Sequence, residues 1–203
     1  MIFFRLMLTL LLMPLLWPTA YTQEPQNIIS ALNVIAQKLE GKNITWVVYA
    51  SCGLALQGMD IQPNDIDVLA DKNDMLKIND ILRDYEIEPL KSAFLETLAS
   101  TMTATRVKFL INNCVVEVMG GFKIKSKVDN MLYDMDKKLE NPDIIEVDDF
   151  KIPVLPLLRS LELYKLMGRE KDISKIPKIE RYITTVTGKK ERGWRDYFCV
   201  YIL

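Results

Sequence analysis

The strongest restriction on the fold comes from residues 44–50, ITWVVYA, which are apolar or β-branched almost without interruption. A run this short predicts a strand, and the lack of polar positions predicts that both faces of the strand are covered. Apolar residues at helical spacing within 28–39 predict a helix just before it, capped by Asn27 and stopped by Gly41. The chain is therefore expected to form a mixed α/β domain.

The segment after this strand combines a short helix with an alternating strand. Residues 51–57 are predicted to form the helix, which ends at Gly58. Residues 64–69 alternate between polar and apolar, which is the period of a strand. Because successive strand residues point to opposite faces, Asp65 and Asp67 are expected to point the same way.

A β-hairpin is predicted from two further apolar runs, 106–111 and 114–119. The pair Asn112–Asn113 joins them, and asparagine tolerates the positive φ angles of a tight turn. Gly120–Gly121 is expected to break the second strand. Other elements are also predicted: a helix capped by Asp71, a small hairpin around Asp148 and Asp149, and helices at 157–167 and 172–183.

One region has no clear pattern, whereas the helix predicted at 157–167 has two distinct faces. Residues 86–103 show no clear period and receive no assignment. In the 157–167 helix, Leu158 is expected to face inward with the other apolar residues, while Lys165 and Arg169 are expected to lie on the opposite side.

The composition excludes several kinds of catalyst. The 203 residues include no histidine, which rules out Ser/His/Asp triads, Cys/His proteolysis and histidine-bound zinc. The three cysteines are far apart in sequence and indicate buried free thiols rather than a zinc site or disulfides. The 26 basic and 27 acidic residues nearly cancel, so bulk nucleic-acid binding is not expected. Chemistry must therefore depend on carboxylates, lysine or a metal ion.

Three carboxylates suit that role. Asp65 and Asp67 share a strand face, and Glu117 lies in an apolar strand, where an unpartnered charge would be costly to bury. A shared divalent metal ion would remove that cost and bind a triphosphate. The short helix that Ser51 opens lies between the strand at 44–50 and the strand at 64–69, and its free backbone N–H groups would favour phosphate.

The stretch WVVYASCGLALQGMDIQPNDIDVLADKND, residues 46–74, resembles the signature of the minimal nucleotidyltransferases of the polymerase β type. In that family a GS pair opens a helix and a DxD pair follows on the next strand. The segments VVEVMGG and IPVLPLLRSLELYKLMGREKDISKI extend the likeness over about residues 27–183, and the second is similar to archaeal and other prokaryotic members. The resemblance implies a polymerase β-like nucleotidyltransferase fold with a mixed central sheet flanked by helices.

The resemblance also implies a set of site residues. Asp65, Asp67 and Glu117 occupy the catalytic and metal-binding positions of the motif, with Mg²⁺ or Mn²⁺ as the expected metal. Ser51 matches the motif serine, but Ala50 replaces the motif glycine and would resist a positive φ. Three residues, Lys165, Arg169 and Lys171, match a basic segment that would reach a triphosphate, although a solvated helix face is the competing interpretation; Lys165 and Lys171, with Ala50 and Ser51, are the predicted nucleotide-binding set.

Two functions remain open at this stage. The first is an enzyme that transfers a nucleoside monophosphate from a nucleoside triphosphate to an acceptor hydroxyl on a protein, small molecule or RNA; the resemblance implies ATP as the triphosphate. The second, prompted by Ala50, is a catalytically weakened nucleotide-binding module or a toxin–antitoxin partner of the same fold.

The two ends of the chain are expected to lie outside the domain. Residues 1–25 contain an apolar run that resembles a signal peptide or is an artefactual extension, residues 26–186 form the predicted transferase domain, and 187–203 form a tail. The expected location is cytoplasmic if the extension is artefactual, and exported or membrane-tethered otherwise.

Overall fold

The computed structural model describes residues 24–187, so the expectations about residues 1–23 and 188–203 lie outside the described residues. The helices are α1 (Pro25–Leu39), α2 (Ala50–Leu56), α3 (Lys72–Ile81), α4 (Leu157–Met167), α5 (Glu170–Ile173) and α6 (Ile176–Thr187), with 3-10 turns η1 (Arg83–Tyr85) and η2 (Met135–Lys138). The strands are β1 (Trp46–Tyr49), β2 (Ile66–Ala70), β3 (Glu86–Glu96), β4 (Ser100–Ile111), β5 (Cys114–Ser126), β6 (Leu132–Asp134), β7 (Asp143–Val147) and β8 (Phe150–Val154). No helix in the described part is long and apolar enough to cross a membrane.

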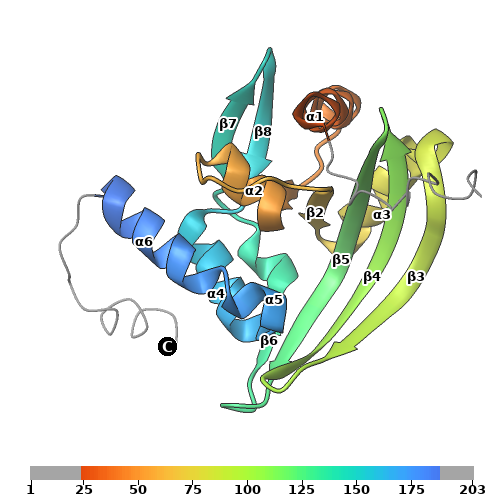
Figure 1. The fold of residues 1–203 in the computed structure, drawn as a ribbon. Helices are drawn as coiled ribbons and strands as arrows, with labels where there is room; N and C mark the ends of the chain where they lie inside the picture. The colour runs from red at the N-terminus through yellow and green to blue at the C-terminus, as the bar shows by residue number, and fades with distance from the viewer. Residues whose placement is uncertain (1–23, 188–203) are drawn as a thin grey trace, which may run out of the picture.

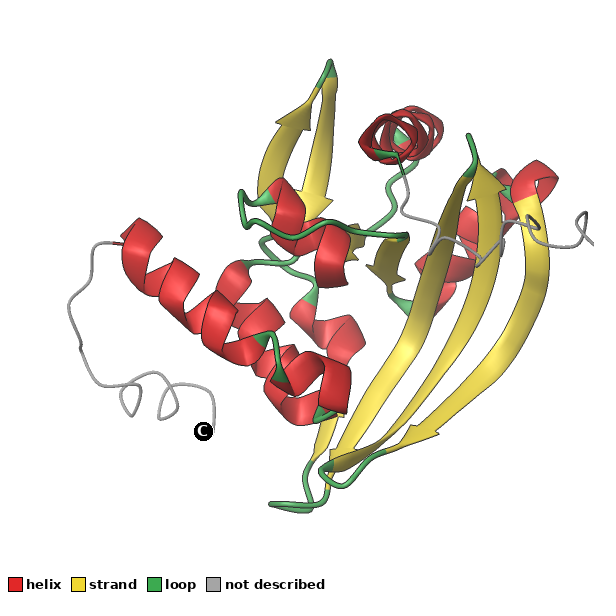
Figure 2. Ribbon diagram, in the orientation of Figure 1, coloured by secondary structure: helices red, strands yellow, loops and turns green. Residues whose placement is uncertain are grey.

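The strands form one mixed sheet in the order β3-β4-β5-β2-β1-β8-β7, with β6 paired to β5. The pairs β2–β5 and β1–β8 are parallel, and the other neighbours are antiparallel. Figure 2 shows that β3, β4 and β5 are the long strands, and Figure 1 shows α4, α5 and α6 grouped together, apart from α1. The predicted mixed sheet with flanking helices is therefore present.

The short strand β1 lies between two hydrophobic cores. Its residues Trp46 and Val48 belong to a core with α1 and α3, while Val47 and Tyr49 belong to a second core with α4 and α6. All four side chains are buried. The prediction that this strand is covered on both faces is confirmed.

The first helix begins earlier than its sequence pattern indicated. Pro25 is its first residue and Glu24 occupies the N-cap position, so Asn27 lies inside the helix and the predicted cap is wrong. Proline suits this position because its φ is already helical and its missing N–H has no partner there. Gly41, with φ of 69°, follows the helix end as expected.

The predicted hairpin is confirmed, but its predicted end is wrong. Asn112 and Asn113 have φ angles of 48° and 64°, as a tight turn requires. Gly120–Gly121 does not break β5, which instead has a β-bulge there, in which two residues, Gly121 and Phe122, oppose one residue of β4, Ala104. Gly121 has φ of 63°, a conformation that glycine adopts without strain.

The bulge changes the side of the sheet to which the even-numbered residues of β5 point. Before it, Val116 and Val118 belong to the α1–α3 core. After it, Phe122 and Ile124 belong to the α4–α6 core. The extra residue shifts the two-residue alternation by one, so a single strand contributes to both cores.

Residues 86–103, which the sequence pattern left unassigned, contain β3 and the start of β4. β3 is the edge strand of the sheet, and none of its residues is fully buried. Its apolar and polar side chains therefore need not alternate, which explains the missing period.

The carboxyl-terminal helices correct two further predictions. α4 has the predicted bounds, and Leu161 and Tyr164 face the core as expected. Leu158, which was also expected to face inward, is 47% exposed. The single helix predicted for 172–183 is two helices, α5 and α6. Pro177 lies in the first turn of α6, where proline is tolerated, so the break falls just before it.

Candidate active site

The register of three strands brings the main candidate residues together. Asp67 is the direct partner of Tyr49 across the β1–β2 pair and of Glu117 across the β2–β5 pair. Neighbouring strands lie about 4.8 Å apart, and paired residues point to the same face of the sheet. Asp65, two residues before Asp67, precedes β2. The three predicted carboxylates therefore lie side by side on the face that α4 and α6 cover.

The two aspartates are held where ionisation is unfavourable. Burial raises the pKa of Asp67 to about 7, and the charges of Asp65 and Glu117 add to the effect. Burial, followed by the charge of Glu117, also raises the pKa of Asp65. Like charges at this separation destabilise each other unless a cation lies between them.

Glu117 has a different environment from the one its sequence context suggested. Its side chain is half-buried, and its partner is an arginine: Arg106 Nη1 donates to Glu117 Oε1 at 2.5 Å. The side chains of the described residues contain no group of three or more histidines, cysteines or acidic residues arranged to hold a metal ion. Glu117 is therefore next to the aspartates in register but is turned toward Arg106.

The donor atoms at this place still fit a hard divalent cation. Carboxylate oxygens are the ligands that Mg²⁺ and Mn²⁺ prefer. Burial is the largest cause of the raised pKa values of Asp65 and Asp67, and the neighbouring carboxylates add to it. Asp65 and Asp67 are therefore the candidate ligands already placed together, and Glu117 would need to turn away from Arg106 to join them.

The turn from β1 into α2 carries a residue other than glycine at positive φ. Ala50 is the first residue of α2 and has φ of 55°, in the left-handed region where glycine is favoured. Ser51 follows it and is partly exposed. The alanine therefore adopts the positive φ that the sequence predicted it would resist, at the cost of backbone strain.

Arg169 faces these carboxylates, although the sequence pattern placed it on an outer helix face. α4 ends at Gly168, whose φ of 59° turns the chain back, so Arg169 does not continue the helical pattern. Its charge lowers the pKa of Asp67 and of Tyr49, which indicates that it lies close to both. Gly168 was the signal in the sequence that could have revealed this, because glycine after a helix usually reverses the chain.

Asp172 holds Arg169 in place. It is fully buried and forms a two-point ion pair with the guanidinium, of which the Arg169 Nη2 to Asp172 Oδ1 contact is 3.0 Å. Burial lowers the pKa of Arg169, but the ion pair more than compensates. A fixed guanidinium is well suited to bind phosphate oxygens.

The two predicted lysines have different surroundings. The charge of Lys171 lowers the pKa of both Asp65 and Asp67, so it lies near the carboxylates. Lys165 forms an ion pair with Glu180 of α6, at 2.7 Å. Lys108 and Lys175 also lower the pKa of Asp65 and were not among the predicted residues.

The cysteines behave as buried thiols. Cys52 and Cys114 are free and buried, and Cys199 lies outside the described residues. Burial raises the pKa of Cys114 to about 11 and that of Cys52 still further above its usual range. Neither thiol is therefore a candidate nucleophile at neutral pH.

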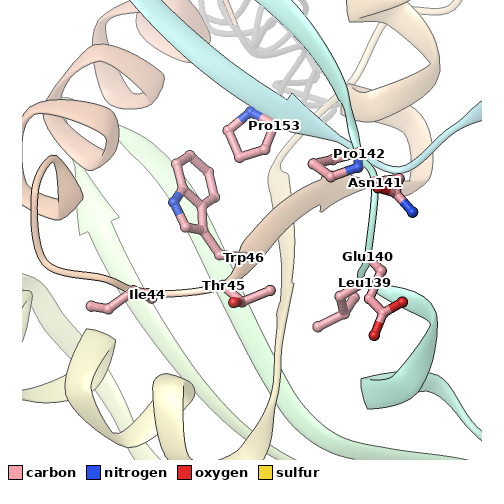
Figure 3. Close-up of a pocket in the computed structure, with 8 residues that line it drawn as sticks. All are labelled: Ile44, Thr45, Trp46, Leu139, Glu140, Asn141, Pro142 and Pro153. Atoms are coloured by element: carbon pink, nitrogen blue, oxygen red, sulfur yellow. The ribbon is translucent and has the colours of Figure 1, made fainter.

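The structure also contains a cavity of about 490 Å³ away from these residues. Figure 3 shows its lining, in which Trp46 and Pro153 lie with Pro142 and Glu140. Trp46 is at the opposite end of β1 from Tyr49, the partner of Asp67. The lining contains no basic side chain, so the cavity does not suit a triphosphate.

Comparison with known proteins supports the sequence resemblance. Residues 31–179 match the family model described as aminoglycoside-2''-adenylyltransferase. No curated protein matches the chain significantly. Among solved structures, a "putative nucleotidyltransferase" from Thermotoga maritima has a similar fold, with a TM-score of 0.62 and 23% sequence identity, over 81% of this chain and 98% of that one.

Two Helicobacter pylori structures match more weakly. JHP933 aligns with a TM-score of 0.31 and 11% identity over 70% of this chain and 56% of its own. A "putative nucleotidyltransferase" aligns with a TM-score of 0.36 and 12% identity over 70% of this chain and 59% of its own. The Thermotoga maritima match confirms the predicted mixed α/β nucleotidyltransferase fold.

Proposed function

Because the chain belongs to the aminoglycoside-2''-adenylyltransferase family of nucleotidyltransferases, we propose that it transfers AMP from ATP to an acceptor hydroxyl, with Asp65, Asp67 and Glu117 as its metal ligands. One observation carries the proposal: the register that makes Asp67 and Glu117 direct partners, with Asp65 on the same face. These carboxylates would hold Mg²⁺, which would supply positive charge to offset the negative charge that develops on the phosphates during transfer.

The chain's own residues account for the other parts of the reaction. Asp65, Asp67 and Glu117 would hold the cation, and Glu117 would also help to deprotonate the attacking hydroxyl. Arg169 and Lys171 neutralise the β- and γ-phosphates, with Arg169 held by the buried Asp172. Ala50 and Ser51, at the start of α2, would contact the phosphates through their backbone N–H groups and the Ser51 hydroxyl.

The acceptor is proposed only as a hydroxyl group. The family description names an aminoglycoside, which is a polycation. The wall that β3 and β4 form beside Glu117 carries Lys91, Arg106 and Lys108, and its one carboxylate, Glu88, contacts all three. Glu117 also pairs with Arg106, so these five groups carry a net charge of about +1, next to the carboxylates of Asp65 and Asp67. The charge of the wall therefore does not select the acceptor, and the choice between a neutral, anionic and cationic acceptor is left to the panel below.

Binding of ATP to the full-length protein tests the site. We expect Mg²⁺-dependent affinity for ATP, and a loss of tenfold or more in Asp67→Asn, because the amide cannot replace a carboxylate ligand. Asp60→Asn is the matched control, since Asp60 is an exposed aspartate in the loop before β2. Equal ATP affinity for wild type and Asp67→Asn, measured by calorimetry with and without Mg²⁺, would contradict the proposal.

The strained Ala50 supports a second candidate, a nucleotide-binding or toxin–antitoxin partner module without transferase activity. Pyrophosphate release separates the two candidates. Release that depends on both Asp67 and an added acceptor supports the transferase, whereas tight ATP binding without release across neutral, anionic and cationic acceptors supports the module.

A further inference from the structure

Glu117 lies between two sets of groups that compete for it. On one side its register partner is Asp67 of β2, and on the other its register partner is Lys108 of β4. A carboxylate in this position can turn toward the aspartates, where a cation would bind it, or toward the basic residues of β4. The structure shows the second arrangement.

The ion pair of Glu117 is selective. Its direct partner, Lys108, pairs instead with Glu88 at 3.2 Å. Glu117 pairs with Arg106, which lies two residues before Lys108 in β4. Arg106 also has a second carboxylate within reach, because its Nη2 is 3.7 Å from Glu88 Oε2. The guanidinium therefore has an alternative partner if Glu117 leaves it.

We propose that Arg106 is a positioning residue that holds Glu117 away from Asp65 and Asp67 until a divalent metal binds, and that Glu88 then takes over the guanidinium. The inference rests on the proposed function, because it requires the three carboxylates to be metal ligands. It accounts for the finding that, among the side chains of the described residues, no three acidic groups are already arranged to hold a metal ion. Metal binding then includes the cost of breaking the Arg106–Glu117 pair.

Mn²⁺ binding to the full-length protein, followed by electron paramagnetic resonance, gives a readout that does not depend on catalysis. Arg106→Gln removes both the competitor for Glu117 and a nearby positive charge, so we expect about fivefold tighter Mn²⁺ binding. Glu88→Gln removes the alternative partner, so we expect weaker binding. These opposite directions distinguish positioning from a purely structural role, which would weaken binding in both variants.

Two controls isolate the ion pair. Lys108→Gln removes a similar charge that does not pair with Glu117, and we expect a change of less than about twofold. In a Glu117→Gln background, Arg106→Gln is expected to have no larger effect than Lys108→Gln, because the carboxylate for which Arg106 and the metal compete has been removed. Thermal unfolding of each variant verifies that it is folded, and Glu88→Gln remains an independent test if Arg106→Gln does not fold.

The outcomes separate this inference from the proposed function. Mn²⁺ binding that is lost in Asp67→Asn but unchanged or weakened in Arg106→Gln overturns the role of Arg106 alone. An Arg106→Gln effect that persists in the Glu117→Gln background also overturns it. Mn²⁺ affinity that is the same in wild type and Asp67→Asn overturns both.

Discussion

Ala50 is an L-residue in a left-handed conformation, at the turn that the proposed function assigns to phosphate binding. Its φ of 55° costs an L-residue about 1 kcal/mol, whereas glycine adopts this conformation freely. The turn geometry is therefore retained in this chain despite the missing glycine. The alanine methyl group is the remaining obstacle to close approach of a phosphate.

We expect Ala50→Gly to raise the free energy of unfolding by about 1 kcal/mol, because it relieves this strain. Urea unfolding measures the change. Ala31→Gly is the control, since Ala31 lies within α1 with an ordinary helical φ, and there glycine should destabilise by about 1 kcal/mol. Changes of the same sign in both variants would show that Ala50 is not strained.

Asp67 should make the metal-free protein less stable as pH rises. Its pKa is about 7 in the folded protein, against about 4 in an unfolded chain. The folded state therefore binds this proton more tightly, and that stabilisation is present below about pH 4 and lost as pH rises to about 7. Urea unfolding between these limits should show the fall in wild type and a smaller fall in Asp67→Asn.

Adding Mg²⁺ tests whether a cation compensates the ionised carboxylate of Asp67. At pH 8, Mg²⁺ should restore stability to wild type, because it compensates the ionised carboxylates. It should not do so in Asp67→Asn, while Asp60→Asn should behave as wild type. A pH dependence that is identical in all three proteins would show that Asp67 has an ordinary pKa.

At the level of elements, the bulge at Gly120–Gly121 lets β5 serve both hydrophobic cores. The two glycines are needed for different reasons. A Cβ on Gly120 would lie 2.8 Å from Met75 Cβ and 3.1 Å from Asp71 O, whereas one on Gly121 would meet nothing closer than 3.7 Å. Gly121 is instead required for its positive φ.

Gly120→Ala should therefore be more destabilising than Gly121→Ala. We expect a loss of about 2–3 kcal/mol for the first, because α3 must move away from β5, and about 1 kcal/mol for the second. The two variants differ only in position, so each controls for the other. Equal losses in urea unfolding would mean that the contact with α3 adjusts freely.

The turn between α4 and α5 should contribute more to ATP binding than the exposed part of α4. Arg169→Gln is expected to lower ATP affinity about tenfold, because a charge-assisted hydrogen bond to phosphate is lost. Lys165→Gln, which removes the partner of Glu180, should change it by less than about twofold. Calorimetry with Mg²⁺ present measures both, and a larger effect at Lys165 would restore its predicted role.

At the level of the whole molecule, the described elements extend from Pro25 to Thr187, one residue beyond each predicted domain boundary. We propose that this region folds as the transferase domain. A fragment of residues 24–187 should unfold in a single transition, and ATP with Mg²⁺ at about 100 times its Kd should stabilise it by about 2.7 kcal/mol. Unfolding in two steps, or no stabilisation by ATP, would contradict this.

The location of the protein stays a prediction, because it depends on residues 1–23, which lie outside the described part. The mass of the mature amino terminus would distinguish a cytoplasmic protein from an exported one.

Much of this site followed from local patterns in the sequence. The alternation in 64–69 predicted that Asp65 and Asp67 share a face, and Asn112–Asn113 predicted the hairpin that carries Glu117. Such patterns depend on residues a few positions apart, where backbone geometry sets the direction of each side chain. The alanine at position 50, where the motif has glycine, likewise predicted that a positive φ there would be strained.

The tertiary structure alone decided which groups meet across the sheet. The pairing of β2 with β5 makes Asp67 and Glu117 neighbours although fifty residues separate them in the chain, and the hairpin register puts Arg106 within reach of Glu117. Strand register depends on burying both faces of the sheet against helices from distant parts of the chain, which no local period encodes. Arg169 is a different case, because Gly168 marks the chain reversal locally in the sequence, but only the packing of α4 in the second core brings Arg169 close enough to Asp67 to lower the pKa of that carboxylate.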